Sequence, residues 1–116
     1  MSRRPFVAGN WKLNKKLGEA TSLARSLKAR LVSRPRAEVA IAPVFTSLSA
    51  VKEALAGSAI QLCAQNVHFE DQGAFTGEVS APLLADVGCT YCIVGHSERR
   101  HVFDDTDDAI NKRVHA

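Results

Sequence analysis

The sequence lacks any apolar run long enough to cross a membrane. A spanning helix needs about 20 consecutive apolar residues, and no stretch approaches that length. The opening MSRRPFVAGN has basic residues but no apolar segment of signal-peptide length, so it predicts no secretion signal. With 46% hydrophobic and 23% charged residues among 116, the composition is that of one soluble globular domain. We therefore expect a cytoplasmic protein that has no membrane partner.

Cysteine is scarce, at three residues: Cys63, Cys89 and Cys92. An odd count without an export signal argues against a disulfide framework. Cys89 and Cys92 match C-x-x-C, but a thioredoxin-type pair needs its first cysteine at a helix N-terminus, and this pair leads into a predicted strand. With His96, a zinc site would have three nearby ligands and no second cluster. We expect buried structural thiols and no metal.

Acidic residues are nearly absent from residues 1–36, which hold ten Lys/Arg and one acid, whereas residues 37–116 hold five Lys/Arg and eleven acids. The two balances, +9 and −6, sum to the net charge of +3. A basic N-terminal segment of this kind can attract nucleic acid, but without sequence specificity. However, Arg25, Lys28 and Arg30 lie among periodic leucines, as on the solvent face of a helix. We therefore expect no nucleic-acid partner.

Apolar segments of two kinds alternate along the chain. Short, almost wholly apolar runs predict four strands, at residues 5–9, 38–42, 60–65 and 91–94. Apolar residues at spacings of three and four, with cap residues such as Ser80 and Thr106, predict four helices, at 17–31, 46–56, 80–86 and from 106 onward. The stretch Ser33-Arg34-Pro35 should end the first helix. Such alternation implies an α/β fold with parallel strands. The absence of G-x-G-x-x-G after the first strand disfavours a dinucleotide-binding fold.

Polar side chains gather where the predicted strands end. They are Asn10 and Lys12 after the first strand, Gln65 and Asn66 after the third, and His96, Ser97 and Glu98 after the fourth. The carboxyl ends of parallel strands form the active face of such folds. Asn10 and Lys12 lie two apart in an extended segment, so their side chains leave on the same side. A cation, an amide and an imidazole around one opening suit an anionic oxygen.

Each of these residues also has a simpler interpretation. Lys12 begins a basic run and can be surface charge, Asn10 can be an ordinary turn residue, and Glu98 can form a local ion pair with Arg99. The position of His96 directly behind a buried strand favours function. The remaining histidines lack convergent partners in the sequence, and we expect them to be structural or solvated: His68, His101 and His115.

Four motifs together resemble the triosephosphate isomerase family. They are AGNWK at 8–12, AQN at 64–66, GAFTGE at 73–78 and VGHSERR at 94–100. The resemblance implies a (β/α)8 TIM barrel, of which residues 1–116 would hold about the first four β/α units as the N-terminal half of a single domain. It also implies a glycolytic and gluconeogenic isomerase that interconverts dihydroxyacetone phosphate and glyceraldehyde 3-phosphate through an enediolate. Such an enzyme is a cytoplasmic homodimer and uses no metal or cofactor.

The resemblance implies roles for particular residues. His96 would polarise the substrate carbonyl as a neutral imidazole, kept uncharged by a helix N-terminus. Lys12 would place positive charge beside the developing oxyanion, and Asn10 would help to hold the substrate. Glu98 and Ser97 would lie behind these groups, with Glu98 as the partner of Lys12. The cluster after the fourth strand would thus orient a catalytic site and balance its charges.

The polar stretch at residues 66–78 is too long for a simple turn and predicts a functional loop. By resemblance, Thr76 and Gly77 in this loop would lie at the dimer interface, with Thr76 inserted into the neighbouring subunit. A departure from the family follows Phe103, where DDTDD replaces the usual GESDE. The shorter side chain of Asp105 puts polar networks near that interface in doubt.

The chain also differs from the family in its length. The family's catalytic glutamate, its closing lid and its main phosphate-gripping loops lie beyond residue 116. We therefore expect this chain alone to be inactive, with uncovered strand edges and an uncovered apolar face. A second hypothesis is a non-catalytic half-barrel that acts only in assembly or self-association. A third, a different sugar-phosphate isomerase on the same scaffold, is disfavoured because VGHSERR with GAFTGE is so particular a combination.

Overall fold

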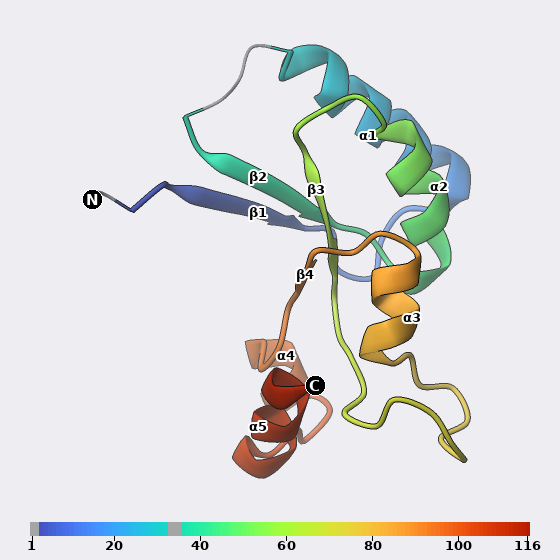
Figure 1. Ribbon diagram of the computed structural model, residues 1–116, viewed down its shortest axis with the longest axis vertical. Coiled ribbons are helices and arrows are strands. Elements are labelled where there is room, and N and C mark those ends of the chain that lie inside the picture. Colours follow the sequence, from blue (N-terminus) through green and yellow to red (C-terminus); the bar gives the residue numbers. More distant parts are fainter. Residues whose placement is uncertain (1–2, 33–35) are drawn as a thin grey trace.

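The computed structural model describes residues 3–32 and 36–116. Its centre is one parallel sheet in the order β1-β2-β3-β4. The strands are β1 (Phe6–Asn10), β2 (Glu38–Ala42), β3 (Gln61–Ala64) and β4 (Tyr91–Cys92). The sheet is strongly twisted, so that β1 and β2 run across the view while β3 and β4 run down it (Figure 1). Sequential neighbours pair throughout, which is the arrangement of one half of a β/α barrel.

Helices follow the strands, as predicted. They are α1 (Leu17–Arg30), the 3-10 turn η1 (Phe45–Ser47), α2 (Leu48–Ala54), α3 (Ala81–Asp86), α4 (Ser97–His101) and α5 (Asp107–His115). Helices α1 and α2 lie side by side against one face of the sheet (Figure 1). Helices α4 and α5 follow β4 at the other end of the chain. All the helices of the described residues are too short or too polar to cross a membrane.

Two helix ends show how the sequence sets these boundaries. At the start of α5, the Thr106 hydroxyl accepts a hydrogen bond from Ala109 N–H at 3.1 Å, and Asp107 and Asp108 occupy the first turn, where acids favour the helix dipole. Just past α3, Gly88 has a φ of +101°, the left-handed conformation in which glycine commonly ends helices.

The main hydrophobic core lies between the sheet and the helices. Alternate strand residues point to opposite faces, so Ile41 and Leu62 face the helices, whereas Ala40 and Cys63 face the other side. The core on the helix side is closed by buried residues of three helices: Ala20, Ala24, Leu48, Val51 and Leu84. Because this packing joins units along the first three quarters of the chain, it fixes where the ends of β1, β2 and β3 lie.

The opposite face of the sheet, which is the barrel interior, holds a smaller cluster. Tyr91 packs against it and donates a hydrogen bond to Glu38 Oε1 at 2.6 Å, which raises the pKa of the Tyr91 phenol. Phe6 lies beside Tyr91, with ring centroids 4.8 Å apart, yet Phe6 is 47% exposed and Val7 is 55% exposed. The uncovered edge and apolar surface expected of a half-barrel are thus present on β1.

Several local predictions need correction. The predicted helix at 46–56 begins as a 3-10 turn, and the fourth strand is only two residues long. Ser80 is the N-cap residue of α3, but its hydroxyl makes no cap bond and is buried without a partner. Helix α4 was not predicted, because five residues are too few to show a periodic pattern. The helix break predicted at 33–35 lies outside the described residues.

The thiols also differ from the prediction. All three cysteines are free, but only Cys63 is buried, whereas Cys89 is partly exposed and Cys92 is exposed. Burial raises the pKa of the Cys63 thiol to about 11, as expected of an unreactive structural cysteine. Cys92 lies on β4, which is an edge strand of the sheet formed by the described residues. Over residues 3–32 and 36–116, no three His, Cys, Asp or Glu side chains form a group that could hold a metal ion.

Candidate active site

Asn10, Lys12 and His96 line one cleft of about 590 Å³ at the carboxyl ends of the strands. Asn10 ends β1, and His96 follows β4, so the cleft joins the two edge strands of the sheet. Gln65 and Glu98 line the same cleft. The polar residues that follow three different strands are therefore brought to a single opening, which is the geometry expected at this end of a parallel β/α fold.

Lys12 is held in a strained backbone conformation. Its φ is +56°, a left-handed value that costs an ordinary residue about 1–2 kcal/mol. The Asn10 side-chain oxygen accepts from Lys12 N–H at 3.0 Å, and the Gln65 side-chain amide donates to Lys12 O at 2.8 Å and to Ala42 O at 2.8 Å. Amide side chains thus bind the N–H and the carbonyl group of Lys12. One of these side chains, that of Gln65, also links Lys12 to Ala42 at the end of β2.

The Lys12 ammonium pairs with the Glu98 carboxylate, Nζ to Oε2, at 3.1 Å. The two side chains are 52% and 47% exposed, and exposed pairs add little to stability, at most about 1 kcal/mol. Stability therefore does not explain the pair. Its structural effect is to hold the ammonium of the β1 end beside the first turn of α4.

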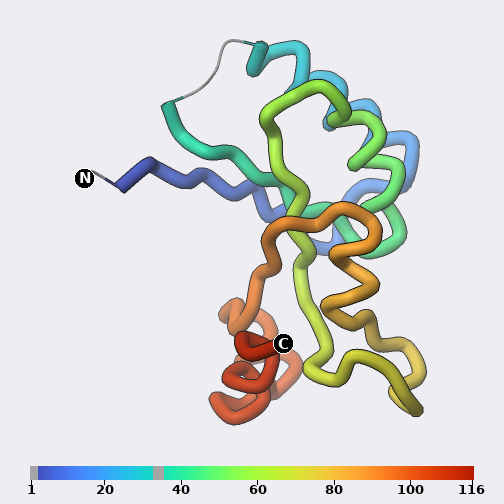
Figure 2. The backbone as a smooth tube through the Cα atoms, viewed as in Figure 1, coloured from blue at the N-terminus to red at the C-terminus, as the bar shows by residue number. Residues whose placement is uncertain are grey.

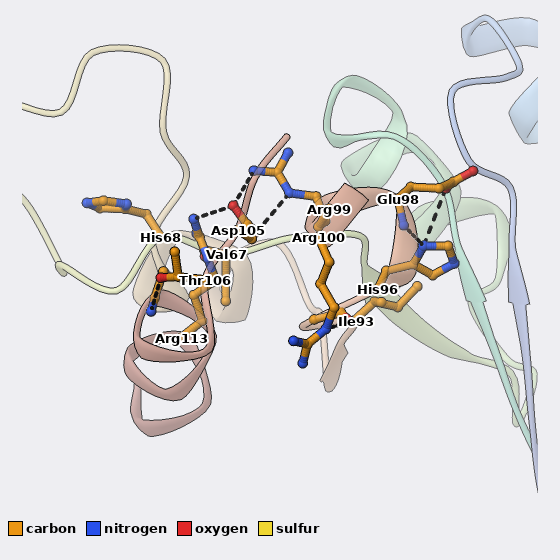
Figure 3. Close-up of polar contacts among 12 residues, drawn as sticks. Val67, His68, Ile93, His96, Glu98, Arg99, Arg100, Asp105, Thr106 and Arg113 are labelled. Carbon is orange, nitrogen blue, oxygen red and sulfur yellow. Dashed lines mark hydrogen bonds and ion pairs between the residues drawn. The ribbon is translucent and has the colours of Figure 1, made fainter. Parts of the chain in front are cut away.

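His96 is the N-cap residue of α4, and its Nδ1 accepts a hydrogen bond from Glu98 N–H at 3.1 Å. A nitrogen that accepts carries no proton, so the neutral ring carries its proton on Nε2. The Glu98 Oε1 atom lies 3.4 Å from the same Nδ1, and Figure 3 shows both contacts. Glu98 therefore touches Lys12 with one carboxylate oxygen and His96 with the other.

These contacts define what the cleft can do. It presents an ammonium from one strand end and an imidazole with a donor nitrogen from another, together with the amide of Asn10. A positive charge about 4 Å from a developing negative charge is worth about 4 kcal/mol at an effective dielectric of 20. The arrangement is therefore suited to stabilising a negative oxygen that forms during a reaction.

An ionic cluster with a buried carboxylate, Asp105, supports α4. Asp105 accepts hydrogen bonds from Arg99 Nε at 3.1 Å and Nη2 at 3.3 Å, and lies 3.7 Å from Arg113 Nη2. Arg113 also donates to the carbonyl oxygen of Val67, just past β3. Asp105 and Arg113 side chains are only 8% and 9% exposed. The cluster joins α4, α5 and the start of the long loop (Figure 3).

This cluster changes two expectations. Arg99 pairs with Asp105 rather than with Glu98, so the local Glu98–Arg99 pair is not formed. The shorter side chain of Asp105 still makes a buried network. Sequence reasoning missed Arg113, which looked like an ordinary charge near a helix C-terminus. Its one signal was that residues 110 and 113 share a helix face, with Ile110 buried.

The predicted functional loop leaves β3, turns at its tip and returns to α3, extending away from the rest of the chain (Figure 2). Thr76 and Gly77 are exposed near its tip, with Gly77 at a φ of +95°. His68, expected to lack partners, packs against Phe75 with ring centroids 4.6 Å apart, and its Nδ1 lies 3.4 Å from Glu78 Oε2. The loop is therefore held in shape by contacts between its own side chains.

The other predicted residues lie in simpler surroundings. Ser97 is the exposed first residue of α4, and Asn66 lines the cleft beside Gln65. His101 and His115 are exposed, which confirms that they are solvated.

The triosephosphate isomerase family model matches residues 5–116. The chain belongs to the triosephosphate isomerase family. It is 54% identical over 114 residues to triosephosphate isomerase of Syntrophotalea carbinolica, covering 98% of this chain and 45% of that protein. It is 51% identical over 116 residues to triosephosphate isomerase of Acetivibrio thermocellus, covering 100% and 46%.

A solved structure gives the same result for the fold. Triosephosphate isomerase from Bartonella henselae matches with a TM-score of 0.91 and 39% identity, over 98% of this chain and 47% of that chain. The chain thus spans a little less than half the length of the relatives that it matches. The four strands of the described residues form part of a (β/α)8 barrel, which confirms the predicted fold class.

Proposed function

We propose that the protein carrying these residues is a triosephosphate isomerase, which interconverts dihydroxyacetone phosphate and glyceraldehyde 3-phosphate. The observation that supports this most is the shared cleft, in which Glu98 binds both Lys12 and His96: its carboxylate pairs with the Lys12 ammonium, and its backbone N–H donates to His96 Nδ1. Such an enzyme acts in glycolysis and gluconeogenesis, and we expect it in the cytoplasm.

The geometry suits proton transfer next to a carbonyl. When a base removes the proton, negative charge develops on the carbonyl oxygen, and the intermediate is an enediolate. In our proposal, His96 donates a hydrogen bond from Nε2 to this oxygen, Lys12 stabilises its charge, and Asn10 holds the substrate. None of these steps needs a metal or a cofactor.

The segment would supply only the charge-stabilising half of the site. By family resemblance, the glutamate base, the lid and the main phosphate-binding loops belong to the other half of the barrel. We therefore propose that residues 1–116 alone do not catalyse the reaction, and that they are the N-terminal half of one barrel domain.

We also propose that the protein is a homodimer. Large apolar side chains at the rim of the cleft are open to solvent: Leu13 is 92% exposed, Val102 67% and Phe103 61%. The loop carrying Thr76 and Gly77 extends outward and has its own apolar tip residue, Phe75, at 42% exposed. In a two-fold dimer, the loop of each subunit would cover the apolar rim of the other.

A non-catalytic half-barrel that acts in assembly remains the second candidate. It is favoured by the exposed apolar side chains of β1, Phe6 and Val7, which lie on an edge strand that can pair with another chain. The two proposals differ in whether a barrel completed by the missing half turns over substrate.

A chimera tests the proposal. We define the complete barrel as residues 1–116 followed by the part of the Syntrophotalea carbinolica isomerase that this chain does not match; that relative is 54% identical over the matched part. We expect the complete barrel to interconvert the two triose phosphates in a coupled assay and to elute as a dimer. Residues 1–116 alone should show no turnover above the buffer rate. A folded complete barrel without turnover, or turnover by residues 1–116 alone, would contradict the proposal.

A further inference from the structure

Arg100 contacts the peptide groups on both sides of His96. Its side-chain Nε donates to the carbonyl oxygen of Gly95 at 2.9 Å, and its backbone N–H donates to the carbonyl oxygen of His96 at 3.1 Å. These carbonyls belong to the peptide bonds that precede and follow His96. Because each peptide group is planar, holding both of them sets the backbone angles of His96, which are −56° for φ and 146° for ψ.

We propose that Arg100 is a positioning residue for His96, acting through the Gly95 carbonyl rather than through the substrate. This inference rests on the proposed isomerase function. Figure 3 shows the side chains of Arg100, within α4, and His96, at its N-cap, pointing in different directions, and Arg100 does not line the cleft. Its effect on the imidazole is therefore exerted through the backbone.

The packing around Gly95 supports this assignment. Gly95 has a φ of +66°, and a Cβ added there would lie 3.1 Å from Arg100 Nη2 and 3.1 Å from Ile110 Cγ2. The guanidinium therefore lies directly against the glycine on which the chain turns from β4 into α4. A bond from a charged donor to a backbone carbonyl is among the stronger hydrogen bonds of proteins.

Among the described residues, the Arg100 side chain has one other hydrogen-bond partner, Asp107, whose Oδ1 lies 2.7 Å from Arg100 Nη1. The Asp107 side chain is 93% exposed and that of Arg100 is 40% exposed. Ion pairs this open to solvent contribute little. The contact with Gly95, not the pair with Asp107, is therefore the one that should matter for His96.

The consequence for the ring follows from its hydrogen bond. His96 Nδ1 meets Glu98 N–H at 3.1 Å only while the backbone of His96 aims the imidazole at it. If the Gly95 peptide group is released, the ring turns and Nδ1 loses its donor. The tautomer with its proton on Nε2 is then no longer enforced. The chemical step should slow, while substrate binding by Asn10 and Lys12 changes little.

The test compares Arg100→Met, Arg100→Lys and Asp107→Asn in the complete barrel. We expect Arg100→Met to lower kcat by about 10- to 100-fold, the size of effect produced by small misplacements, and to change KM by less than about threefold. Nitrogen NMR of the His96 ring should show a mixture of tautomers in this variant. Arg100→Lys, which keeps a charged donor, should recover part of both effects, and Asp107→Asn should change neither.

Two results would overturn the inference. One is a folded Arg100→Met protein with unchanged kcat and an unchanged His96 ring spectrum, even if its melting temperature falls. The other is an Asp107→Asn protein with the same defects as Arg100→Met, which would place the effect in the anchoring of α5. If Arg100→Met does not fold, Arg100→Lys and Arg100→Gln are compared in the same way. If the unsubstituted barrel folds but is inactive, the proposed function fails, and the ring spectrum still decides the role of Arg100.

Discussion

Lys12 and His96 reach one cleft from the two opposite edge strands, but the chain holds them in different ways. Lys12 lies in a left-handed conformation, with a φ of +56°, and amide side chains hold its two peptide groups. His96 has an ordinary extended backbone at the start of a helix, and its ring is bonded to that helix. Gly95, just before His96, takes the left-handed turn instead.

The difference shows which residue at each end of the site adopts the unfavourable backbone conformation. At the β1 end, the strained residue is Lys12 itself, the residue that we propose stabilises the oxyanion, and hydrogen bonds from Asn10 and Gln65 hold it there. The β4 end moves the unusual conformation to a neighbouring glycine, for which it costs little. Substitutions at the two ends should therefore have different effects on stability and activity. We expect the following results for the complete barrel, with all variants compared at one protein concentration.

The largest effect should come from Lys12→Met. Loss of a charge worth about 4 kcal/mol to the oxyanion should lower kcat/KM by about 10³-fold. Stability should hardly change, because the Lys12 side chain is half exposed. Lys16→Met is the matched control, since Lys16 is an exposed lysine of the same segment that does not line the cleft. Equal kinetics for the two variants in a steady-state assay would show that Lys12 is only surface charge.

At the β4 end, the largest effect on stability should come from Asp105→Asn. The substitution leaves two arginines without their buried carboxylate partner, and breaking such a network costs about 3 kcal/mol. Asp104→Asn is the control, because Asp104 is exposed and should shift stability by less than about 0.5 kcal/mol. Urea unfolding measures both. An unchanged midpoint for Asp105→Asn would mean that the network does not support α4.

A pair of opposite substitutions tests the left-handed conformations of Lys12 and Gly95 directly. Gly95→Ala should destabilise by about 2 kcal/mol, because alanine is strained at this φ and its Cβ would meet Arg100 and Ile110 at 3.1 Å. Relative to Lys12→Ala, Lys12→Gly should stabilise by up to about 1 kcal/mol, because it relieves the strain. Comparison with Lys12→Ala separates the backbone from the lost side chain. Thermal unfolding measures both changes in stability. If alanine is less stable than glycine by the same amount at both positions, or more stable at both, the two ends do not differ as proposed.

A smaller loss of stability than that of Gly95→Ala should come from Gln65→Met, which keeps the shape of the side chain but removes its amide. Loss of two hydrogen bonds, to Lys12 O and Ala42 O, should cost about 1–2 kcal/mol. Hydrogen exchange should become faster around Lys12 and stay unchanged around His96. Gln72→Met, in the exposed part of the long loop, should change neither. Faster exchange at both ends would show that the two halves of the site are held as one unit.

The sequence predicted the architecture well because its signals are local. Periodic leucines placed α1, and the hydroxyl of Thr106 followed by two acids placed the start of α5. The residues of the cleft were found because polar side chains followed apolar strands. The supporting contacts could not be found in this way. Gln65 reaches across 53 positions to Lys12, and Arg113 reaches across 46 to Val67, and no local pattern encodes such distances.

The central claim is that Lys12 and His96 act on one oxygen of the substrate, and it is tested most directly by a crystal structure of the complete barrel with a planar, anionic analogue of the enediolate. We expect Lys12 Nζ and His96 Nε2 each to lie within hydrogen-bond distance, about 2.7–3.2 Å, of the analogue oxygen that stands for the carbonyl oxygen. An analogue bound in this cleft without contact to His96 Nε2, or bound elsewhere in the barrel, would contradict the claim.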